Sequence, residues 1–423
     1  MGNEFDSQSF WDASQLDTEL KRVADICNGC RRCYNLCPSF NDLFERLDQE
    51  AIDGDAEKLG GKDFKSITDL CYQCKLCFNH CPYTPPHRWE IDFPRLMLRS
   101  KAVETRATGQ SRQDRFLGQV DRLGKLGTSF APVLNWLNRN RLIRSLLEKF
   151  LGIHRDRVLP NYAAQTFRAW FDKREVGPAN GRNKVALFHT CTVNYQEPAI
   201  GQAAVRVLEK NGIHVAVPEQ RCCGMPFLDG GDIESTKNNA RANIESLSRL
   251  VQQGYDILVP GPTCSYMLKR EYPAMIVGEA AQKVAEKTFD ICEYLMRLHG
   301  EGKLSTSFAK PMGKIAYQIP CHLRAQNIGF KSRDLMELIP GTNVQLIEKC
   351  AAIDGTWGLK RQYFDLSLKV AEPLLREIRG GNPDLTVSDC PLAGLQIEQA
   401  LKRKSVHPIQ VLERAYGLDQ KEN

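Results

Sequence analysis

The segment Cys27-Asn-Gly-Cys30-Arg-Arg-Cys33-Tyr-Asn-Leu-Cys37-Pro38 decides how this 423-residue chain is interpreted, because its spacing returns in Cys71-Tyr-Gln-Cys74-Lys-Leu-Cys77-Phe-Asn-His-Cys81-Pro82. Both runs have the form C-x2-C-x2-C-x3-C-P. A [4Fe–4S] cluster needs four thiolates, and this spacing places three of them on one tight loop. Zinc sites also use C-x2-C pairs, but they lack the third cysteine at this spacing and the closing Cys-Pro.

The two runs predict two [4Fe–4S] clusters that exchange one ligand. In two-cluster ferredoxins the fourth cysteine of each run ligates the other cluster. We therefore expect one cluster on Cys27, Cys30, Cys33 and Cys81, and a second on Cys71, Cys74, Cys77 and Cys37. The insertion over residues 38–70 is long for a minimal ferredoxin and suits a helical two-cluster domain, predicted here to span residues 1–92.

The composition is that of a globular protein from a reducing compartment. Hydrophobic residues make up 42% of the chain and charged residues 26%, as in ordinary soluble domains. Residues 1–26 are polar and acidic and lack the apolar core of a secretory signal. We therefore assign the sixteen cysteines to metal binding rather than to disulfides. No run of roughly eighteen apolar residues predicts a transmembrane helix.

A basic, amphipathic helical segment is predicted over residues 93–180. Between residues 95 and 174 the sequence has 17 Lys or Arg and 6 Asp or Glu, in a chain of net charge +6. Apolar residues recur at helical spacing at Val133, Trp136, Leu137, Ile143, Leu146, Leu147, Phe150 and Leu151. Such a helix can lie in a bilayer interface that contains anionic lipid, or it can pack on its own protein or on a partner subunit. No nucleic-acid fold pattern accompanies the basic residues, so we expect no nucleic acid as a partner.

From Lys184 onward the sequence alternates strands with helices. Hydrophobic runs predict strands at residues 184–189, 214–218, 255–260, 314–320, 343–347 and 384–388, and helices at 199–210, 233–253 and 361–379. This alternation is typical of α/β units with parallel sheets. We expect one such unit over residues 181–310 and a second over 311–423, which makes the chain an α+β multidomain protein.

Cysteines follow the predicted strands, at the edge where open α/β sheets bind ligands. In the first α/β unit these cysteines are Cys191, Cys222, Cys223 and Cys264. The adjacent pair precedes Gly224, which would let the backbone approach a ligand closely. These four thiols are candidates for a further iron–sulfur cluster. Alternatively, Cys191 and Cys264 are small buried core residues, a common role of free cysteine.

The motif Cys222-Cys223-Gly224 with its flanking cysteines resembles the cysteine-rich CCG domain of the heterodisulfide reductase B subunit group. Over most of its length the chain is also similar to the iron–sulfur C subunits of anaerobic glycerol-3-phosphate dehydrogenases. That similarity rests on the double ferredoxin run, on Leu187-Phe-His-Thr-Cys-Thr-Val-Asn-Tyr195, on Pro320-Cys-His322 and on Phe130-Ala-Pro-Val133 in the amphipathic middle.

The second α/β unit departs from the pattern of that family. Where the family has a second C-C-G and a C-x2-C, this chain has Cys350-Ala351-Ala352 and Cys390-Pro391-Leu392-Ala393. Cys321, Cys350 and Cys390 remain, beside His322. Three thiolates can still hold a cluster that has an open iron or an oxygen or imidazole fourth ligand, or they are the remnant of a lost site. His322 is more simply explained as the cap of the following helix.

The resemblance implies an electron-transfer component rather than a self-contained enzyme. No glycine-rich dinucleotide fingerprint follows a strand and no nucleophile elbow is present, so we assign no catalytic residue. The family implies that the chain takes electrons from flavoprotein dehydrogenase subunits and passes them to membrane quinone. Its location would then be peripheral, on the cytoplasmic face of the inner membrane. Two alternatives stay open: a heterodisulfide or thiol–disulfide reductase, and an electron donor to a soluble peroxidase.

Overall fold

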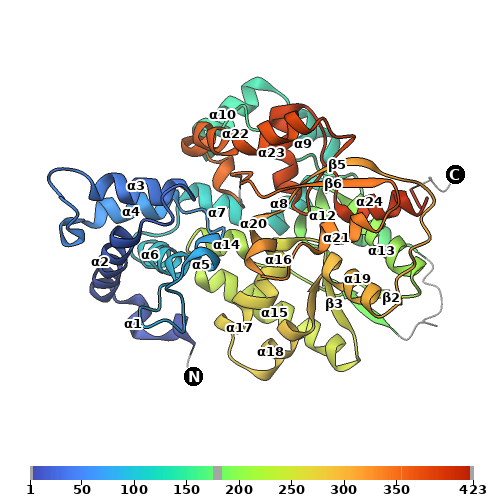
Figure 1. Ribbon diagram of the computed structural model, residues 1–423, viewed down its shortest axis with the longest axis horizontal. Helices are drawn as coiled ribbons and strands as arrows, with labels where there is room; N and C mark the ends of the chain where they lie inside the picture. Colours follow the sequence, from blue (N-terminus) through green and yellow to red (C-terminus); the bar gives the residue numbers. More distant parts are fainter. Residues whose placement is uncertain (1–2, 175–182, 354, 420–423) are drawn as a thin grey trace. The chain divides into compact units, whose positions relative to one another are not determined.

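The computed structural model describes residues 3–174, 183–353 and 355–419, which Figure 1 shows as a ribbon. The chain divides into two compact units. The first contains the residues up to 118 together with 226–236, and the second contains residues 119–225 and 237 onward. The four-part division drawn from the sequence remains a prediction, and its boundary between residues 180 and 181 lies outside the described residues.

The first unit is helical. Its helices include α1 (Gln8–Trp11), α2 (Ala13–Cys30), α3 (Pro38–Leu47), α4 (Gly61–Leu70), α5 (Leu76–His80), α6 (Phe93–Thr108) and α7 (Arg112–Gly118). Asp12 caps α2, because its carboxylate accepts the N–H groups of Ser14 and Gln15. The interior is aliphatic and aromatic, and its buried side chains include Phe40, Leu43, Phe44, Leu47, Phe64, Ile67, Phe93 and Met97.

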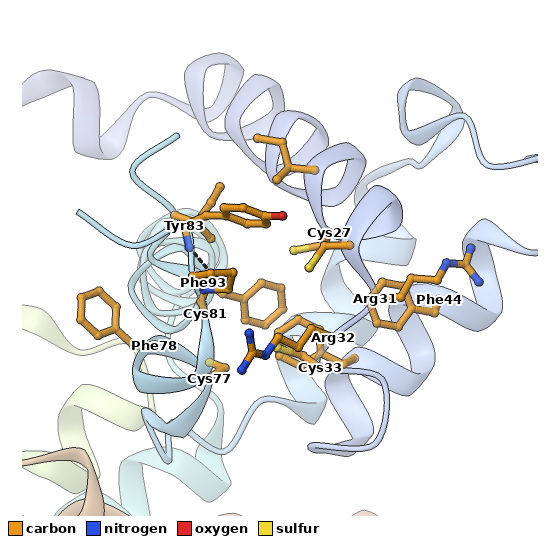
Figure 2. Close-up of a pocket in the computed structure, with 15 residues that line it drawn as sticks. Cys27, Arg31, Arg32, Cys33, Phe44, Cys77, Phe78, Cys81, Tyr83 and Phe93 are labelled. Carbon is orange, nitrogen blue, oxygen red and sulfur yellow. Dashed lines mark hydrogen bonds between the residues drawn. The ribbon is translucent and has the colours of Figure 1, made fainter. Parts of the chain in front are cut away.

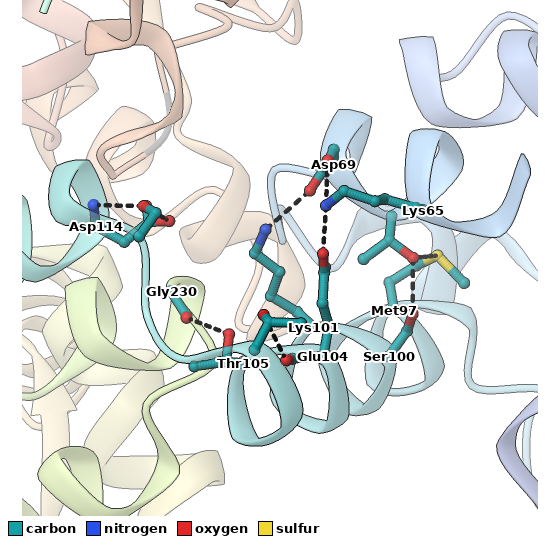
Figure 3. Close-up of polar contacts among 12 residues, drawn as sticks. Lys65, Asp69, Met97, Ser100, Lys101, Glu104, Thr105, Asp114 and Gly230 are labelled. Carbon is teal, nitrogen blue, oxygen red and sulfur yellow. Dashed lines mark hydrogen bonds and ion pairs between the residues drawn. The ribbon is translucent and has the colours of Figure 1, made fainter. Parts of the chain in front are cut away.

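Polar contacts of α6 hold the first unit together (Figure 3). Lys101 Nζ lies 2.8 Å from Asp69 Oδ1 on α4. Farther along α6, the hydroxyl of Thr105 donates to the carbonyl of Gly230 at 3.1 Å. This bond secures residues 226–236, which come from a distant part of the sequence, against the helices of the first unit.

The second unit contains two parallel sheets, of which the first has the strand order β2-β1-β3-β4. Its strands are β1 (Lys184–Leu187), β2 (His214–Ala216), β3 (Asp256–Val259) and β4 (Thr288–Asp290). The helices that follow these strands in sequence are α12 (Cys191–Tyr195), α13 (Pro198–Lys210), α14 (Met225–Asp229), α15 (Ile233–Gln252), α16 (Pro262–Tyr266), α17 (Tyr272–Met275), α18 (Glu279–Glu286) and α19 (Ile291–Gly300). Of these, most of α14 and the first turn of α15 belong to the first unit. The sequence did not predict β4, because Thr288-Phe289-Asp290 contains a single apolar residue and shows no hydrophobic run.

The second sheet has the order β6-β5-β7. It is formed by β5 (Gly313–Gln318), β6 (Thr342–Ile347) and β7 (Leu385–Val387), all parallel. Its helices are α20 (Cys321–Ala325), α21 (Lys331–Glu337), α22 (Phe364–Gly381), α23 (Pro391–Leu401) and α24 (Pro408–Ala415). A helical domain followed by two α/β units with parallel sheets confirms the predicted fold class.

A set of short helices precedes the first sheet: α8 (Val120–Ser129), α9 (Ala131–Leu137), α10 (Arg141–Leu151) and α11 (Phe167–Phe171). The amphipathic stretch predicted as one helix over residues 133–151 is therefore divided between α9 and α10. The division falls at Asn140, whose side chain accepts the N–H groups of Leu142 and Ile143 and so begins a new helix.

Helix α10 places two of its charged residues inward and several of its apolar residues outward. Arg144 and Glu148 are buried, whereas Leu142 is 77% exposed and Phe150 is 68% exposed. The guanidinium of Arg144 donates to the carbonyls of His154, at 2.7 Å, and of Arg155 and Arg157 in the loop that follows. The apolar side of α10 is therefore not packed on the described part of this chain. No helix among the described residues is long and apolar enough to span a bilayer.

We expect Arg144→Ala to destabilise the second unit, because three backbone carbonyls would lose their buried, charged donor. Hydrogen bonds to charged groups contribute about 1.5–3 kcal/mol each, so a net loss of ~2 kcal/mol would lower the thermal midpoint by roughly 4–8 °C. The matched control is Arg141→Ala on the exposed side of the same helix, which should leave the midpoint nearly unchanged. Equal midpoints for the two variants in a thermal melt would contradict the inward orientation.

Candidate iron–sulfur sites

Cysteines from both ferredoxin-type runs line one cavity in the first unit (Figure 2). The cysteines are Cys27, Cys30, Cys33, Cys77 and Cys81. The wall is largely apolar and aromatic, and it includes Ile26, Phe40, Phe44, Ile91 and Phe93. The structure thus brings together the four thiols predicted for the first cluster, three of them from the first run and one from the second.

The end of α2 positions the first thiols of this cavity. Cys27 and Cys30 are three residues apart in the last turn of α2 and therefore lie on one side of it. The helix ends at Arg31, which has the left-handed φ of 48° and donates its N–H to the carbonyl of Cys27. The Arg31 side chain pairs with Asp48 at 2.5 Å, which holds this unusual backbone conformation on the surface.

Cys27 and Cys33 in this cavity have raised pKa values. Burial raises the pKa of Cys27 to about 12, and the nearby charges of Cys33, Cys81 and Cys30 add to the effect. Burial likewise raises the pKa of Cys33 to about 11. A cation is needed to take these sulfurs as thiolates, because buried negative charges close together repel one another. The donor set therefore fits a thiolate-bound iron–sulfur cluster.

The remaining cysteines of the two runs also lie near one another. The pKa of Cys77 is well above its usual range, first because of burial and then because of the charges of Cys74, Cys71 and Cys37. These are the four residues predicted for the second cluster, with Cys37 again supplied by the other run.

At the first predicted cluster, the backbone N–H of Tyr83 donates to the sulfur of Cys81, with the nitrogen 3.4 Å from Sγ.

The loop of the second run is shaped by two residues with left-handed φ, Gln73 at 55° and Lys75 at 63°. Lys75 is only 5% exposed, and its ammonium donates to Gln73 Oε1 at 2.8 Å. The Gln73 amide in turn donates to the carbonyl of Pro94 at 3.1 Å. Lys75 is therefore a buried cation beside Cys71, and its charge counteracts the rise in the pKa of that thiol.

In the second unit, Cys191, Cys222 and Cys264 follow β1, β2 and β3, which are neighbours in a parallel sheet. A hydrogen bond with Cys222, then burial and the charges of Cys222 and Asp121, raise the pKa of Cys191 well above its usual range. A hydrogen bond links Cys223 with Cys264 as well. The structure thus gathers the four cysteines of the first CCG motif, and Gly224 beside them has a φ of 94°.

Three polar residues that the sequence analysis missed surround this group of cysteines. Asn243 accepts the N–H of Arg221 at 2.8 Å and donates to Tyr272 Oη at 2.9 Å. The Tyr272 hydroxyl donates to the carbonyl of Cys223 at 3.0 Å. Asp121 accepts the N–H of Cys222 at 2.7 Å. None of the three belongs to a recognisable spacing motif, so only the fold reveals them.

The second α/β unit places Cys321, Cys350 and Cys390 after β5, β6 and β7, at one edge of its sheet. His322 does not cap the helix that follows. It lies buried inside α20, its Nδ1 is 2.9 Å from Thr263 Oγ1, and its ring stacks on Tyr266.

The two α/β units also approach one another at Cys264. A hydrogen bond with Cys223 lowers the pKa of Cys264, but burial and the charges of Cys191, Cys222 and Cys390 outweigh it and raise the pKa.

Cys292 is the one cysteine that the sequence analysis did not place in any candidate cluster site. It lies buried after β4, with its sulfur within 4.8 Å of carboxylate oxygens of Asp290 and Asp389. Asp389 accepts hydrogen bonds from the hydroxyls of Tyr317, at 2.7 Å, and Ser332. Burial raises the pKa of Asp389 to about 6 and that of Asp290 to about 8.

Family models match three parts of the chain. Residues 20–107 match the Citrate utilization protein B Fer4-like domain, and residues 185–269 and 315–398 each match the Cysteine-rich domain named CCG. Together with the gathered thiols, these matches define the class of the protein. It is an iron–sulfur protein that transfers electrons within an oxidoreductase system.

Comparison with individual proteins identifies the family within this class. The chain is 31% identical over 303 residues to the C subunit of the anaerobic glycerol-3-phosphate dehydrogenase of Escherichia coli K12, covering 71% of this chain and 76% of the relative. It therefore belongs to the family of anaerobic glycerol-3-phosphate dehydrogenase C subunits.

More distant relatives match about half of this chain. It is 28% identical over 238 residues to the B subunit of the CoM/CoB fumarate reductase of Methanothermobacter marburgensis, which is 55% of this chain and 45% of the relative. It is 27% identical over 251 residues to "Lactate utilization protein A" of a Geobacillus species, which is 56% of this chain and 99% of the relative.

The exchange of ligands between the two runs can be tested in a background that lacks the second cluster. In a chain carrying Cys71→Ala and Cys74→Ala, we expect Cys81→Ser to remove the remaining ferredoxin-type cluster and Cys37→Ser to leave it in place. Iron content and the EPR spectrum of the reduced protein measure the outcome. Loss of the cluster with Cys37→Ser but not with Cys81→Ser would show that each run holds its own cluster.

Proposed function

We propose that this protein relays electrons from a flavin-dependent dehydrogenase to membrane quinone, as a peripheral protein on the cytoplasmic face of the inner membrane. Oxidation of an alcohol to a ketone releases two electrons and two protons, and reduction of a quinone to a quinol consumes two of each. An iron–sulfur cluster carries electrons singly. The chain then passes two electrons per substrate molecule, one at a time, and carries no protons.

Three clusters are proposed for this relay. Two [4Fe–4S] clusters are assigned to the eight ferredoxin-type cysteines with the exchanged ligands predicted above, within a module of residues 1–92. A further cluster is assigned to Cys191, Cys222, Cys223 and Cys264 in the unit of residues 181–310. We regard Cys321, Cys350 and Cys390, in the unit of residues 311–423, as the remnant of a fourth site. The replacement of the expected cysteine and glycine by Ala351 and Ala352 supports this interpretation.

The observation that carries the membrane assignment is an apolar face on α8, α9 and α10. We use this name for seven exposed side chains: Leu126, Phe130, Val133, Trp136, Leu142, Leu146 and Phe150. Each is at least half exposed, and Leu142 is the most exposed at 77%. Large apolar side chains exposed in this number along one stretch of chain mark a candidate site of protein or membrane contact.

The charges around the apolar face favour a bilayer. Arg122, Lys125, Arg139, Arg141 and Lys149 are exposed on the same three helices and the turn between them. The acidic residues of this stretch, Asp121 and Glu148, face inward, toward Cys222 and Arg155 respectively. Exposed Trp, Phe and Leu with cations and no exposed acid fit an interface with anionic lipid headgroups. A docking face for a soluble peroxidase has no need of this apolar surface.

We expect Cys222→Ser to remove the third cluster and to leave the two ferredoxin-type clusters intact. Iron content should fall by about a third, and one set of EPR signals of the reduced protein should disappear. The control is Cys292→Ser, which changes a buried cysteine outside the proposed ligands. An unchanged iron content and spectrum in Cys222→Ser would remove the third cluster from the relay.

We expect the full chain to co-sediment with vesicles of phosphatidylcholine and phosphatidylglycerol, and to bind pure phosphatidylcholine less. Leu142→Asp or Phe150→Asp should weaken binding about tenfold or more, since burying such a side chain contributes about 1.5–3 kcal/mol. Val277→Asp is the control, because Val277 is 63% exposed and lies outside the apolar face.

Binding that is unaffected by charges on the apolar face would assign that face to a protein partner instead. Reduction of a disulfide by the isolated, prereduced chain would favour the thiol–disulfide reductase.

A further inference from the structure

Asp121 brings a carboxylate from α8 directly to the cysteines of the first CCG motif. Its Oδ2 accepts the backbone N–H of Cys222 at 2.7 Å, and its Oδ1 lies 3.5 Å from the sulfur of Cys191. These two cysteines come from loops that follow different strands, so one carboxylate touches both loops. Such a bridge fixes the distance between two ligands of the proposed third cluster.

The inner side of α8 is built for this close approach. Gly124 and Gly127 follow Asp121 at intervals of three residues, which places all three on one side of the helix. A Cβ atom at Gly124 would overlap the ring of Tyr195, and one at Gly127 would overlap the ring of Tyr162. Gly124 therefore lets α8 press against Tyr195 of the CCG unit, with Asp121 at the cysteines, and Gly127 lets it press against Tyr162.

The opposite side of the same helix belongs to the apolar face. Leu126 is 54% exposed, and Lys125 beside it is exposed as well. An α-helix with its side chains is about 10 Å across. One helix therefore separates the cysteines of the first CCG motif from the apolar face.

We propose that Asp121 is a positioning residue for the third cluster and that its negative charge lowers the reduction potential of that cluster. The proposal rests on the proposed function, because it requires a cluster on Cys191 and Cys222. Addition of an electron makes a thiolate-bound cluster more negative, and a carboxylate 3.5 Å from a ligand sulfur disfavours that addition. A low potential at this position favours transfer onward to an acceptor that approaches from the apolar face.

The test is a redox titration of the anaerobically reconstituted full chain, followed by EPR. Asp121→Asn keeps an oxygen to accept the N–H of Cys222 but removes the charge. We expect it to retain full iron content and to shift the reduction equilibrium of the third cluster toward the reduced form by about tenfold, which is ~59 mV for one electron. Asp121→Glu, which keeps the charge, should stay nearer the unsubstituted potential.

The matched control is Asp114→Asn, a buried carboxylate that bonds to Ser111 instead of cysteines. It should leave every potential unchanged, and so should Asp121→Asn for the two ferredoxin-type clusters. Full iron content with an unchanged third potential in Asp121→Asn would overturn the proposal. So would loss of iron in both Asp121 variants, which would indicate a ligand or a purely structural residue. If the unsubstituted chain binds only two clusters, the iron count shows that the proposed function itself has failed at this site.

Discussion

The gathering of buried thiols at a few points is the constraint on which the rest of this structure depends. Sulfur atoms held close together in an apolar wall cannot all become thiolates, because each new negative charge raises the pKa of the others. Burial is the largest cause that raises the pKa of Cys27 to about 12 and that of Cys71 to about 11. Bound iron would supply the positive charge that stabilises these neighbouring sulfurs as thiolates. Folding of the first unit and loading of its clusters are therefore thermodynamically linked.

The backbone meets this constraint in two ways. In the first unit, residues with left-handed φ lie at the C-terminal end of α2 and directly before α5, where they turn the loops that carry the cysteines. Arg31 and Lys75 hold these conformations although neither is glycine, and each is secured by a side-chain bond, to Asp48 and to Gln73 respectively. In the second unit, parallel strands carry the cysteines to the carboxyl edge of each sheet, and Thr190 and Gly224 beside them have φ values of 39° and 94°.

Much of this could be predicted from the sequence, because cysteine spacing and strand patterns are local signals. The double run, the strands that become β1, β3 and β5, and the cysteines at their ends were all visible. The orientation of α10 was not, since the period of Leu142, Leu146 and Phe150 is the same whether that side faces the core or solvent. Asp121 was hidden for a different reason: it lies 101 residues from Cys222 in sequence. Only the fold shows which carboxylate meets which cysteine.

The two sides of α8 leave its sequence almost no freedom to change length. Asp121, Gly124 and Gly127 must face the cysteines and tyrosines, while Leu126 and Phe130 must face outward. Each residue of an α-helix advances the direction of its side chain by about 100°. A single inserted or deleted residue would turn a bulky side chain into the tyrosine rings and withdraw the glycines from them. Substitutions on the outer side are compatible with the fold, whereas insertions and deletions within α8 are not.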